Sequence, residues 1–276
     1  MIDRKERGGE MTMVNEYTNL DNDQARYEEY EELLVRRDQL FKEAGSYMTG
    51  YTAEFGDLIT ANFELKIECI KKKKAISYCR RRINRGLGID GNSMQAELDK
   101  EMNLYYVQLK GMIDDTENAK NAEKVGEYRY SRAKKIYRRL AKRLHPDINK
   151  KTNDNDILKE YWNRIVVAYH KSDIEELEDL EVLVRNTMEE LGDVGFEIDY
   201  SDIEKRIERV ERQINDIINT EPYIYGEILN SEERKEELKN NLQEEHDDYE
   251  QYLDTLSKSL DDMLREGGVE VIWKMN

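Results

Sequence analysis

The chain has 276 residues, of which 38% are charged and only two are proline, and its formal net charge is −17 at pH 7. Abundant Glu, Lys, Arg, Leu and Ile with little Pro favours long helices, because sheets need turn residues at short intervals. The composition excludes an all-β fold and disfavours a doubly wound α/β fold. It predicts an all-α protein with long helical hairpins or coiled-coil arms.

The charge is unevenly distributed along the chain. Residues 172–276 carry 32 acidic and 11 basic side chains (−21), whereas the first 171 residues carry 29 acidic and 33 basic side chains (+4). A bulk charge this negative argues against a surface that binds nucleic acid or anionic lipid as a whole.

Several features indicate where the protein resides. The longest apolar run, Ile165–Tyr169, has five residues, and a membrane span needs about 20. The first residues lack the apolar core of a signal peptide. Cys69 and Cys79 stand ten positions apart without further cysteines, which fits a reducing compartment and predicts no structural zinc site. We therefore expect a cytoplasmic protein with no membrane contact.

The N-terminal part of the chain changes character near residue 20. Residues 1–20 have no periodicity and contain Gly8-Gly9, so we expect a flexible tail. From Asp21 apolar residues recur at helical spacing, with a kink or short turn expected at the glycines between residues 45 and 56. Glycines 86, 88 and 91 stop this helix, and Asn92 with Gln95 resembles a capping box. The pattern predicts an N-terminal helical hairpin over residues 21–117.

The rest of the chain alternates helices and stops. The polar stretch Asp114–Asn121 is expected to fray, and a later helix from Ile157 to Leu191 can be interrupted near Ser172-Asp173. Apolar residues then step by four and three over Ile203–Ile217, and a second seam covers Leu242–Met263 with Ser231 as a good N-cap before it. Joined by a short link, these seams predict an antiparallel hairpin over residues 196–267, followed by a tail over 268–276.

The tripeptide His145-Pro146-Asp147 follows a basic helix that ends at Leu144. Pro146 cannot continue a helix and pushes His145 out of helical geometry, so we expect a rigid tip between two helices, with His145 contributing little to the core. Four apolar residues are expected to pack between the helices: Leu140, Leu144, Trp162 and Ile165. The basic helix exterior suits an acidic partner surface.

This region, residues 134–169, resembles the J domain of DnaJ-type cochaperones. The matching residues before the tripeptide are Tyr137, Arg138, Arg139, Leu140 and Ala141, and those after it are Trp162, Ile165, Ala168 and Tyr169. We assign a divergent J-like domain to residues 118–191. In this family the second helix and the His-Pro-Asp loop dock on a DnaK-type ATP-driven chaperone and stimulate its ATP hydrolysis.

The resemblance implies a binding module rather than an enzyme, with no cofactor and no metal. Carried over by position, the partner-binding residues are Lys134, Tyr137, Arg138, Arg139, His145, Pro146, Asp147 and Asn149. The family's first helix is missing, Ile148 replaces the usual basic residue, and no client-binding region is recognisable. Something else, such as the N-terminal hairpin, must then cover the face that the first helix covers. The alternative is a helical scaffold that keeps a J-like fold without chaperone coupling.

Two other features attract attention. Residues 66–86 contain Lys71–Lys74 and Arg80–Arg82, which could form a nucleic-acid-binding helix but are better interpreted as a solvated or intramolecularly paired face. His246 falls on the apolar seam of the last helix, either as a pH-sensitive element or as a residue that fixes the register. The sequence has no Gly-rich phosphate loop, metal-ligand cluster or nucleophile–base pair, so no enzymatic site is predicted.

Overall fold

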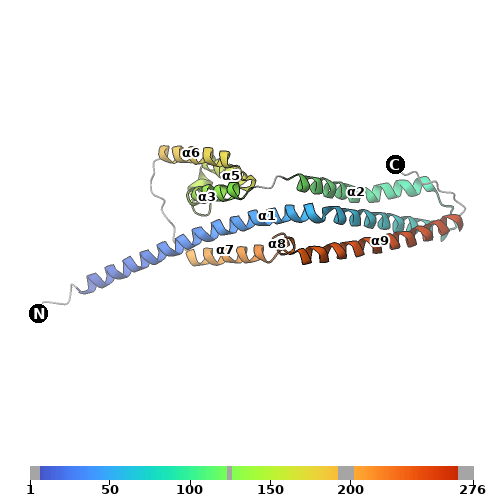
Figure 1. Ribbon diagram of the computed structural model, residues 1–276, viewed down its shortest axis with the longest axis horizontal. Helices are drawn as coiled ribbons and strands as arrows, with labels where there is room; N and C mark the ends of the chain where they lie inside the picture. The colour runs from blue at the N-terminus through green and yellow to red at the C-terminus, as the bar shows by residue number, and fades with distance from the viewer. Residues whose placement is uncertain (1–6, 123–125, 192–201, 267–276) are drawn as a thin grey trace. The chain divides into compact units, whose positions relative to one another are not determined.

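A computed structural model describes residues 7–122, 126–191 and 202–266 (Figure 1), and every regular element in these ranges is a helix. The predicted all-α class is confirmed. The helices are α1 (Arg7–Ile83), α2 (Gly91–Asn121), α3 (Glu127–Leu144), α4 (Lys151–Asp154), α5 (Asp156–Lys171), α6 (Ile174–Glu190), α7 (Ile203–Ile218), α8 (Tyr225–Leu229) and α9 (Glu232–Glu266). Within these ranges no helix combines the length and apolar character needed to cross a membrane.

Helix α1 is unbroken from Arg7 to Ile83, which corrects two expectations. Residues 7–20 are helical rather than a loose tail, and no turn interrupts the helix at the glycines between 45 and 56. Each helical glycine costs only about 1 kcal/mol relative to alanine, and burial of neighbours such as Phe55 and Ile67 outweighs that cost. Gly56 also has a positive role, because a Cβ there would meet Cγ2 of Thr116 in α2 at 2.7 Å.

The chain divides into two compact units that differ from the predicted domain ranges. The first unit comprises Met1–Gly45 and Glu123–Ile224, and the second comprises Ser46–Ala122 and Tyr225–Asn276. Helix α1 contributes to both. Each unit is described by itself below.

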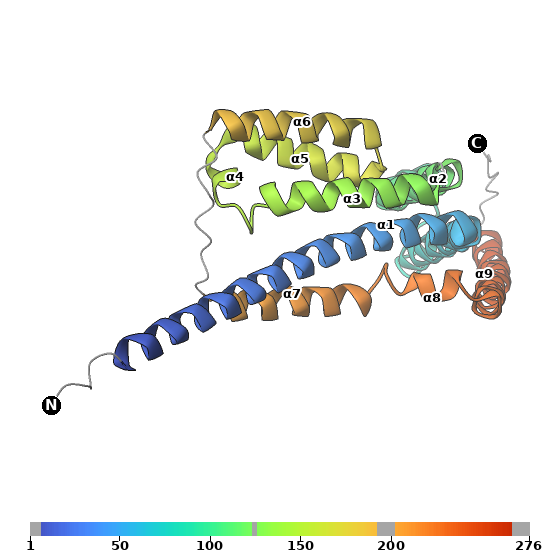
Figure 2. The ribbon, with the colours of Figure 1, turned by 60° about the vertical axis from the view of Figure 1, so that its left-hand side comes forward.

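In the first unit α3, α5 and α6 pack together as three layered helices (Figure 2). Their shared core includes Tyr137, Leu140, Leu144 and Ile165, with Trp162 at its edge, as the sequence predicts. Val35 of α1 joins the same core. Helix α6 directly follows α5 and contributes Ile174, Leu177, Leu180 and Val184 to this core.

The predicted interruption near Ser172-Asp173 is confirmed. Ser172 adopts a left-handed conformation (φ 53°), and the Asp173 side chain accepts a hydrogen bond from the Glu176 amide as N-cap of α6. The buried ammonium of Lys42 donates to the Tyr169 carbonyl and the Ser172 hydroxyl, both at 2.7 Å. Burial lowers the pKa of Lys42 to about 8.

Helix α7 packs on α1 rather than on α9, so the predicted C-terminal hairpin is wrong. Ile203, Ile207 and Val210 form a buried cluster with three side chains of α1: Tyr27, Tyr30 and Leu34. Helices α7 and α9 belong to different units. A heptad seam identifies the apolar face of a helix but not its partner, and α1 presents apolar faces to both seams.

In the second unit α2 folds back on α1, and α9 completes the core. Met94 and Leu98 of α2 pack with Ala75 and Cys79 of α1, and Leu260 joins them from α9. The N-cap of α2 is Asp90, which accepts hydrogen bonds from the amides of the next turn, rather than the expected Asn92. Helix α2 continues through Asp114–Asn121 without fraying.

Helix α9 begins as the sequence predicts. The hydroxyl of Ser231 accepts a hydrogen bond from the Arg234 amide at 3.3 Å, the geometry of an N-cap. Glu232 and Glu233 lie in the first turn, where negative side chains favour the positive end of the helix dipole.

Candidate partner-docking site

The His-Pro-Asp loop is held by its own backbone. Helix α3 ends where His145 leaves helical geometry (ψ 125°), because Pro146 follows it. The His145 carbonyl then accepts two hydrogen bonds, from the amides of Ile148 and Asn149, each at 2.8 Å. The buried Asn149 side chain donates to the Arg143 carbonyl at 2.9 Å and accepts from the Lys151 amide at 3.0 Å. The loop is therefore rigid, and the Asn149 side chain is committed to maintaining it.

The imidazole of His145 is buried, not displayed at an exposed tip. His145 is only 4% exposed, and its ring lies edge-on to Trp162 with the centroids 4.9 Å apart. Nδ1 accepts a hydrogen bond from the Asp147 amide at 3.1 Å. The expectation that His145 contributes little to the core is wrong, because α1 closes over it.

Two residues of α1 meet the His145 ring. Oδ2 of Asp38 lies 3.7 Å from Nε2, and Nη2 of Arg37 lies 3.2 Å from the same nitrogen. Burial lowers the pKa of His145, although the negative charges of Asp38 and Asp147 oppose this shift. The neutral form of the ring is therefore favoured in the fold.

Arg37 and Asp38 also join α1 to the rest of the loop and to α3. The Arg37 guanidinium pairs with Asp38 at 2.9 Å and lies 3.8 Å from the Asp147 carboxylate. The Tyr137 hydroxyl donates to Oδ2 of Asp38 at 2.6 Å, and its ring stacks on Tyr169 with centroids 4.0 Å apart. Burial, followed by the charge of Asp38, raises the pKa of Tyr137, so Tyr137 remains a hydrogen-bond donor.

The basic surface of α3 is paired with acidic residues of α1. Arg138 forms an ion pair with Glu32. Lys142 lies between Glu31 and Glu32, at 3.1 Å and 3.5 Å. Three of these side chains keep 38% or more of their surface accessible: Glu32, Arg138 and Lys142. Exposed pairs of this kind contribute about 0–1 kcal/mol each, so they can exchange for other partners at little cost.

A second set of ion pairs joins α3 to α6. Arg139 binds Glu181 through two hydrogen bonds, at 2.6 and 2.9 Å. Arg132 pairs with Glu178, and Arg129 pairs with Glu175 at 3.1 Å. The basic residues on the exterior of α3 therefore pair with acidic residues of α1 on one side and of α6 on the other.

The structure brings most of the predicted site residues together and separates a few by role. Tyr137, Arg138, His145 and Asp147 all contact the segment of α1 between Glu31 and Asp38, which we call the acidic segment. Arg139 faces α6 instead, while Lys134 is half-buried on α3 and Pro146 is half-buried in the loop.

Sequence reasoning missed the acidic segment. Arg37 stands 108 positions before His145, and nothing local in the sequence links them. The available signal was the pattern of α1, in which the acidic residues Glu31, Glu32 and Asp38 are interspersed with apolar residues that a long helix must bury. An acidic helix face elsewhere in the chain was the natural candidate to meet the basic surface of α3.

Several of the basic residues between 66 and 86 have partners inside the second unit. Lys74 binds Glu101 and Arg81 binds Glu97, both on α2. The ammonium of Lys73 lies 4.7 Å from the centre of the Tyr252 ring. The interpretation as an intramolecularly paired face therefore agrees with these contacts, with α2 as the main source of acidic partners.

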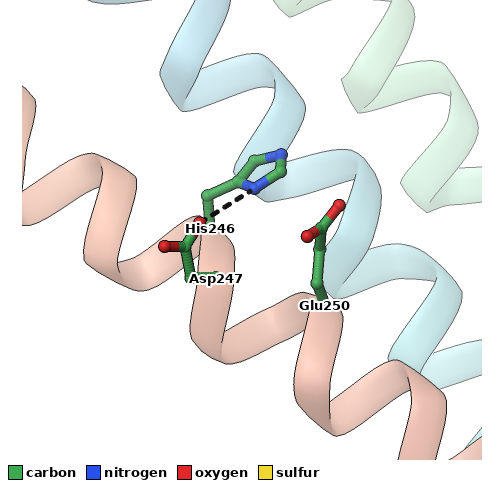
Figure 3. A group of neighbouring side chains, drawn as sticks. All are labelled: His246, Asp247 and Glu250. Carbon is green, nitrogen blue, oxygen red and sulfur yellow. Dashed lines mark ion pairs between the residues drawn. The ribbon is translucent and has the colours of Figure 1, made fainter.

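A small group with metal-ligand chemistry lies on α9 (Figure 3). Ligand atoms of His246, Asp247 and Glu250 lie within 4.8 Å of one another, and Nδ1 of His246 is 3.8 Å from Oδ1 of Asp247. His246 is half-buried, whereas both carboxylates are exposed. These are three donors, one fewer than the four protein ligands that structural zinc sites usually use.

The two cysteines are buried thiols. The Cys69 thiol lies 3.7 Å from the Tyr249 carbonyl, and the Cys79 sulfur lies 3.9 Å from the Met94 sulfur. Burial raises the pKa of both thiols, which lowers their reactivity because the thiolate is the nucleophile.

Comparison of the chain with protein-family models, with curated proteins and with solved structures finds no match in any of the three.

Proposed function

We propose that this protein is a J-domain-like cochaperone or adaptor that docks on a DnaK-type ATP-driven chaperone through α3 and the His-Pro-Asp loop. The observation that carries the proposal is the arrangement around the loop. A basic helix, the tripeptide and a second helix share one core through Tyr137, Leu144 and Trp162. By family resemblance, this arrangement would stimulate ATP hydrolysis by the chaperone.

The acidic segment of α1 adds a condition to docking. It contacts the same residues that the resemblance assigns to the chaperone, namely Tyr137, Arg138, His145 and Asp147. The chaperone and the acidic segment would then compete for α3. If the docking-competent form is a fraction of the population, the apparent affinity for the chaperone falls by that fraction.

The contacts between the acidic segment and the predicted docking residues differ in strength. The ion pairs of Arg138 and Lys142 lie at the surface and exchange easily. The contacts of His145 with Arg37, Asp38 and Trp162 are buried, and opening them exposes an apolar and hydrogen-bonded cluster. We infer that neutralising Glu31 and Glu32 loosens the acidic segment without removing the docking residues.

A single-turnover ATPase assay with the host's DnaK-type chaperone tests this function. We expect stimulation by the wild-type protein, stronger stimulation by Glu31→Gln/Glu32→Gln, and none by His145→Gln in either background. Glu189→Gln/Glu190→Gln is the matched control, since it makes the same charge change at exposed positions of α6. Circular dichroism of each variant verifies that the helices persist.

The alternative is a helical scaffold that keeps a J-like fold without chaperone coupling. The burial of His145 and its contacts with α1 favour this alternative, because the tripeptide already has a structural role. If the Glu31→Gln/Glu32→Gln protein also fails to stimulate ATP hydrolysis at saturating concentration, the scaffold is correct and the cochaperone function is wrong.

A further inference from the structure

Helix α2 has an exposed apolar stripe on the side opposite its buried face. The buried face contains Met94, Leu98 and Met102, which pack in the second unit. On the other side Leu104 is 79% exposed and Val107 is 63% exposed. Water contact at both side chains is unfavourable by about 25 cal/mol for each Å² of apolar surface.

The stripe has the spacing of a helix-pairing seam. Lys100, Leu104, Val107, Gly111 and Asp114 follow one another at steps of four, three, four and three, and all five are exposed. This is the heptad step by which one helix contacts another along its length. The seam belongs to the second unit, whereas the α3 site belongs to the first, and the seam does not depend on the proposed chaperone function.

Gly111 lies inside the seam and has no structural role within its own unit. A Cβ placed there would meet nothing within 4 Å, whereas glycine in a helix interior costs about 1 kcal/mol relative to alanine. A glycine on an exposed apolar face allows a neighbouring helix to approach closely, and it leaves room opposite for a larger side chain such as Leu104.

The charges of the seam are self-complementary. Lys100 precedes Val107 by seven residues, and Asp114 follows Val107 by seven residues. When two copies of α2 cross antiparallel about Val107, each Lys100 faces Asp114 of the second copy, and each Leu104 lies close to Gly111 of the second copy. A two-fold symmetric interface pairs a surface with itself in this way. A parallel pairing would instead place Lys100 against Lys100 and Asp114 against Asp114.

We propose that the exposed seam of α2 is a homodimer interface, occupied by α2 of a second copy of this chain in antiparallel orientation. Charge complementarity about Val107 selects the second copy and sets the orientation. The exposed apolar pair Leu104 and Val107 supplies the driving force, and Gly111 permits the close approach.

Sedimentation equilibrium of the full-length protein tests the interface. We expect a dimer at about 100 μM, and we expect Leu104→Asp to raise the dissociation constant at least about 100-fold, since it places charge at the centre of the seam. Val167→Asp is the matched control, because Val167 of α5 is 53% exposed and lies off the seam. A monomeric wild-type protein, or a dimer that Leu104→Asp leaves intact, overturns the proposal.

Charge exchange tests the orientation. Lys100→Asp and Asp114→Lys should each weaken the dimer about tenfold, because two attractive pairs become repulsive, whereas Lys159→Asp should not. The double variant Lys100→Asp/Asp114→Lys should recover the wild-type dissociation constant. If the two single variants dimerise as well as the wild-type protein, the antiparallel arrangement is wrong. If the seam captures a different protein while the wild-type chain stays monomeric, the second copy is not its occupant.

Discussion

The hydroxyl of Tyr137 in α3 donates a hydrogen bond of 2.6 Å to the carboxylate of Asp38 in α1, across 99 positions of sequence. Tyr137 is a residue that the J-domain resemblance assigns to partner docking, and Asp38 belongs to the acidic segment. The bond therefore places the acidic segment directly against the surface that the resemblance predicts for docking. It also joins the two helices whose charges are complementary elsewhere along their contact.

Removing this hydroxyl should destabilise the first unit. We expect Tyr137→Phe to lower the free energy of unfolding by about 1–3 kcal/mol, because a hydrogen bond to a carboxylate is lost and Asp38 keeps its burial. Urea denaturation measures the change. Tyr128→Phe is the control, since Tyr128 lies on the same helix and is 71% exposed. Equal effects of the two substitutions would mean that the Asp38 bond contributes nothing.

The lowered pKa of His145 predicts a pH dependence of stability. The folded protein favours the neutral ring, so below the ordinary histidine pKa of about 6.5 the unfolded chain binds a proton that the folded chain does not. Stability is therefore lost as pH falls from about 7.5 to 5.5, by at most about 1.4 kcal/mol per pH unit. Burial also lowers the pKa of His170. A comparison of wild type with His145→Gln removes that contribution, because both proteins contain His170.

The measurement is the difference in unfolding free energy between wild type and His145→Gln at each pH. The variant should be less stable than wild type at pH 8, and the gap should narrow as the pH falls. A gap that stays constant from pH 8 to pH 5.5 would mean that His145 titrates alike in the folded and unfolded chains.

Two glycines of α1 should respond to alanine in opposite ways. Gly45→Ala should stabilise the protein by about 0.5–1 kcal/mol, because nothing within 4 Å meets the added carbon and alanine favours the helix. Gly56→Ala should destabilise it by about 1–3 kcal/mol, because the added carbon would meet Oγ1 of Thr116 at 2.5 Å and Cγ2 at 2.7 Å. Thermal unfolding of the two variants separates these outcomes, and a stabilised Gly56→Ala protein would show that α2 can move aside.

The seams of α7 and α9 should act independently. Ile207 is buried in the cluster of α1 and α7, and Leu260 is buried in the cluster of α1, α2 and α9. Ile207→Ala and Leu260→Ala should each cost about 2–5 kcal/mol, and a double-mutant cycle should give a coupling energy within about 0.5 kcal/mol of zero. A coupling of 1 kcal/mol or more would indicate that the two helices pair after all.

The basic residues of α1 should not bind nucleic acid tightly. Lys74 and Arg81 are paired with Glu101 and Glu97, so phosphate groups would have to displace carboxylates as well as counterions. We expect only weak, non-specific association at physiological salt, measured by fluorescence anisotropy with a labelled duplex and a labelled single strand. Micromolar binding that disappears when Lys71–Lys74 are neutralised would contradict this expectation.

The sequence by itself determined the local features. Low proline content and periodic apolar residues are properties of the backbone and of single helix faces, and they were sufficient for the all-α class and for most helix ends. The stop at Pro146, the break at Ser172 and the N-cap at Ser231 follow from covalent geometry or from one side chain bonding to the next turn. The core between α3 and α5 could also be predicted, because each helix presents an apolar face and the stop at Pro146 allows the chain to turn back.

Only the tertiary structure decided which faces meet. The heptad pattern of α7 is equally compatible with pairing to α9, yet its apolar face packs on Tyr27, Tyr30 and Leu34 of α1. His145 follows a helix stop and would be exposed on local grounds alone, but Arg37 and Asp38 cover it from a helix more than 100 positions away. Apolar burial and charge pairing depend on the surface area and the charges that two faces present together, and a single segment of sequence contains only one of those faces.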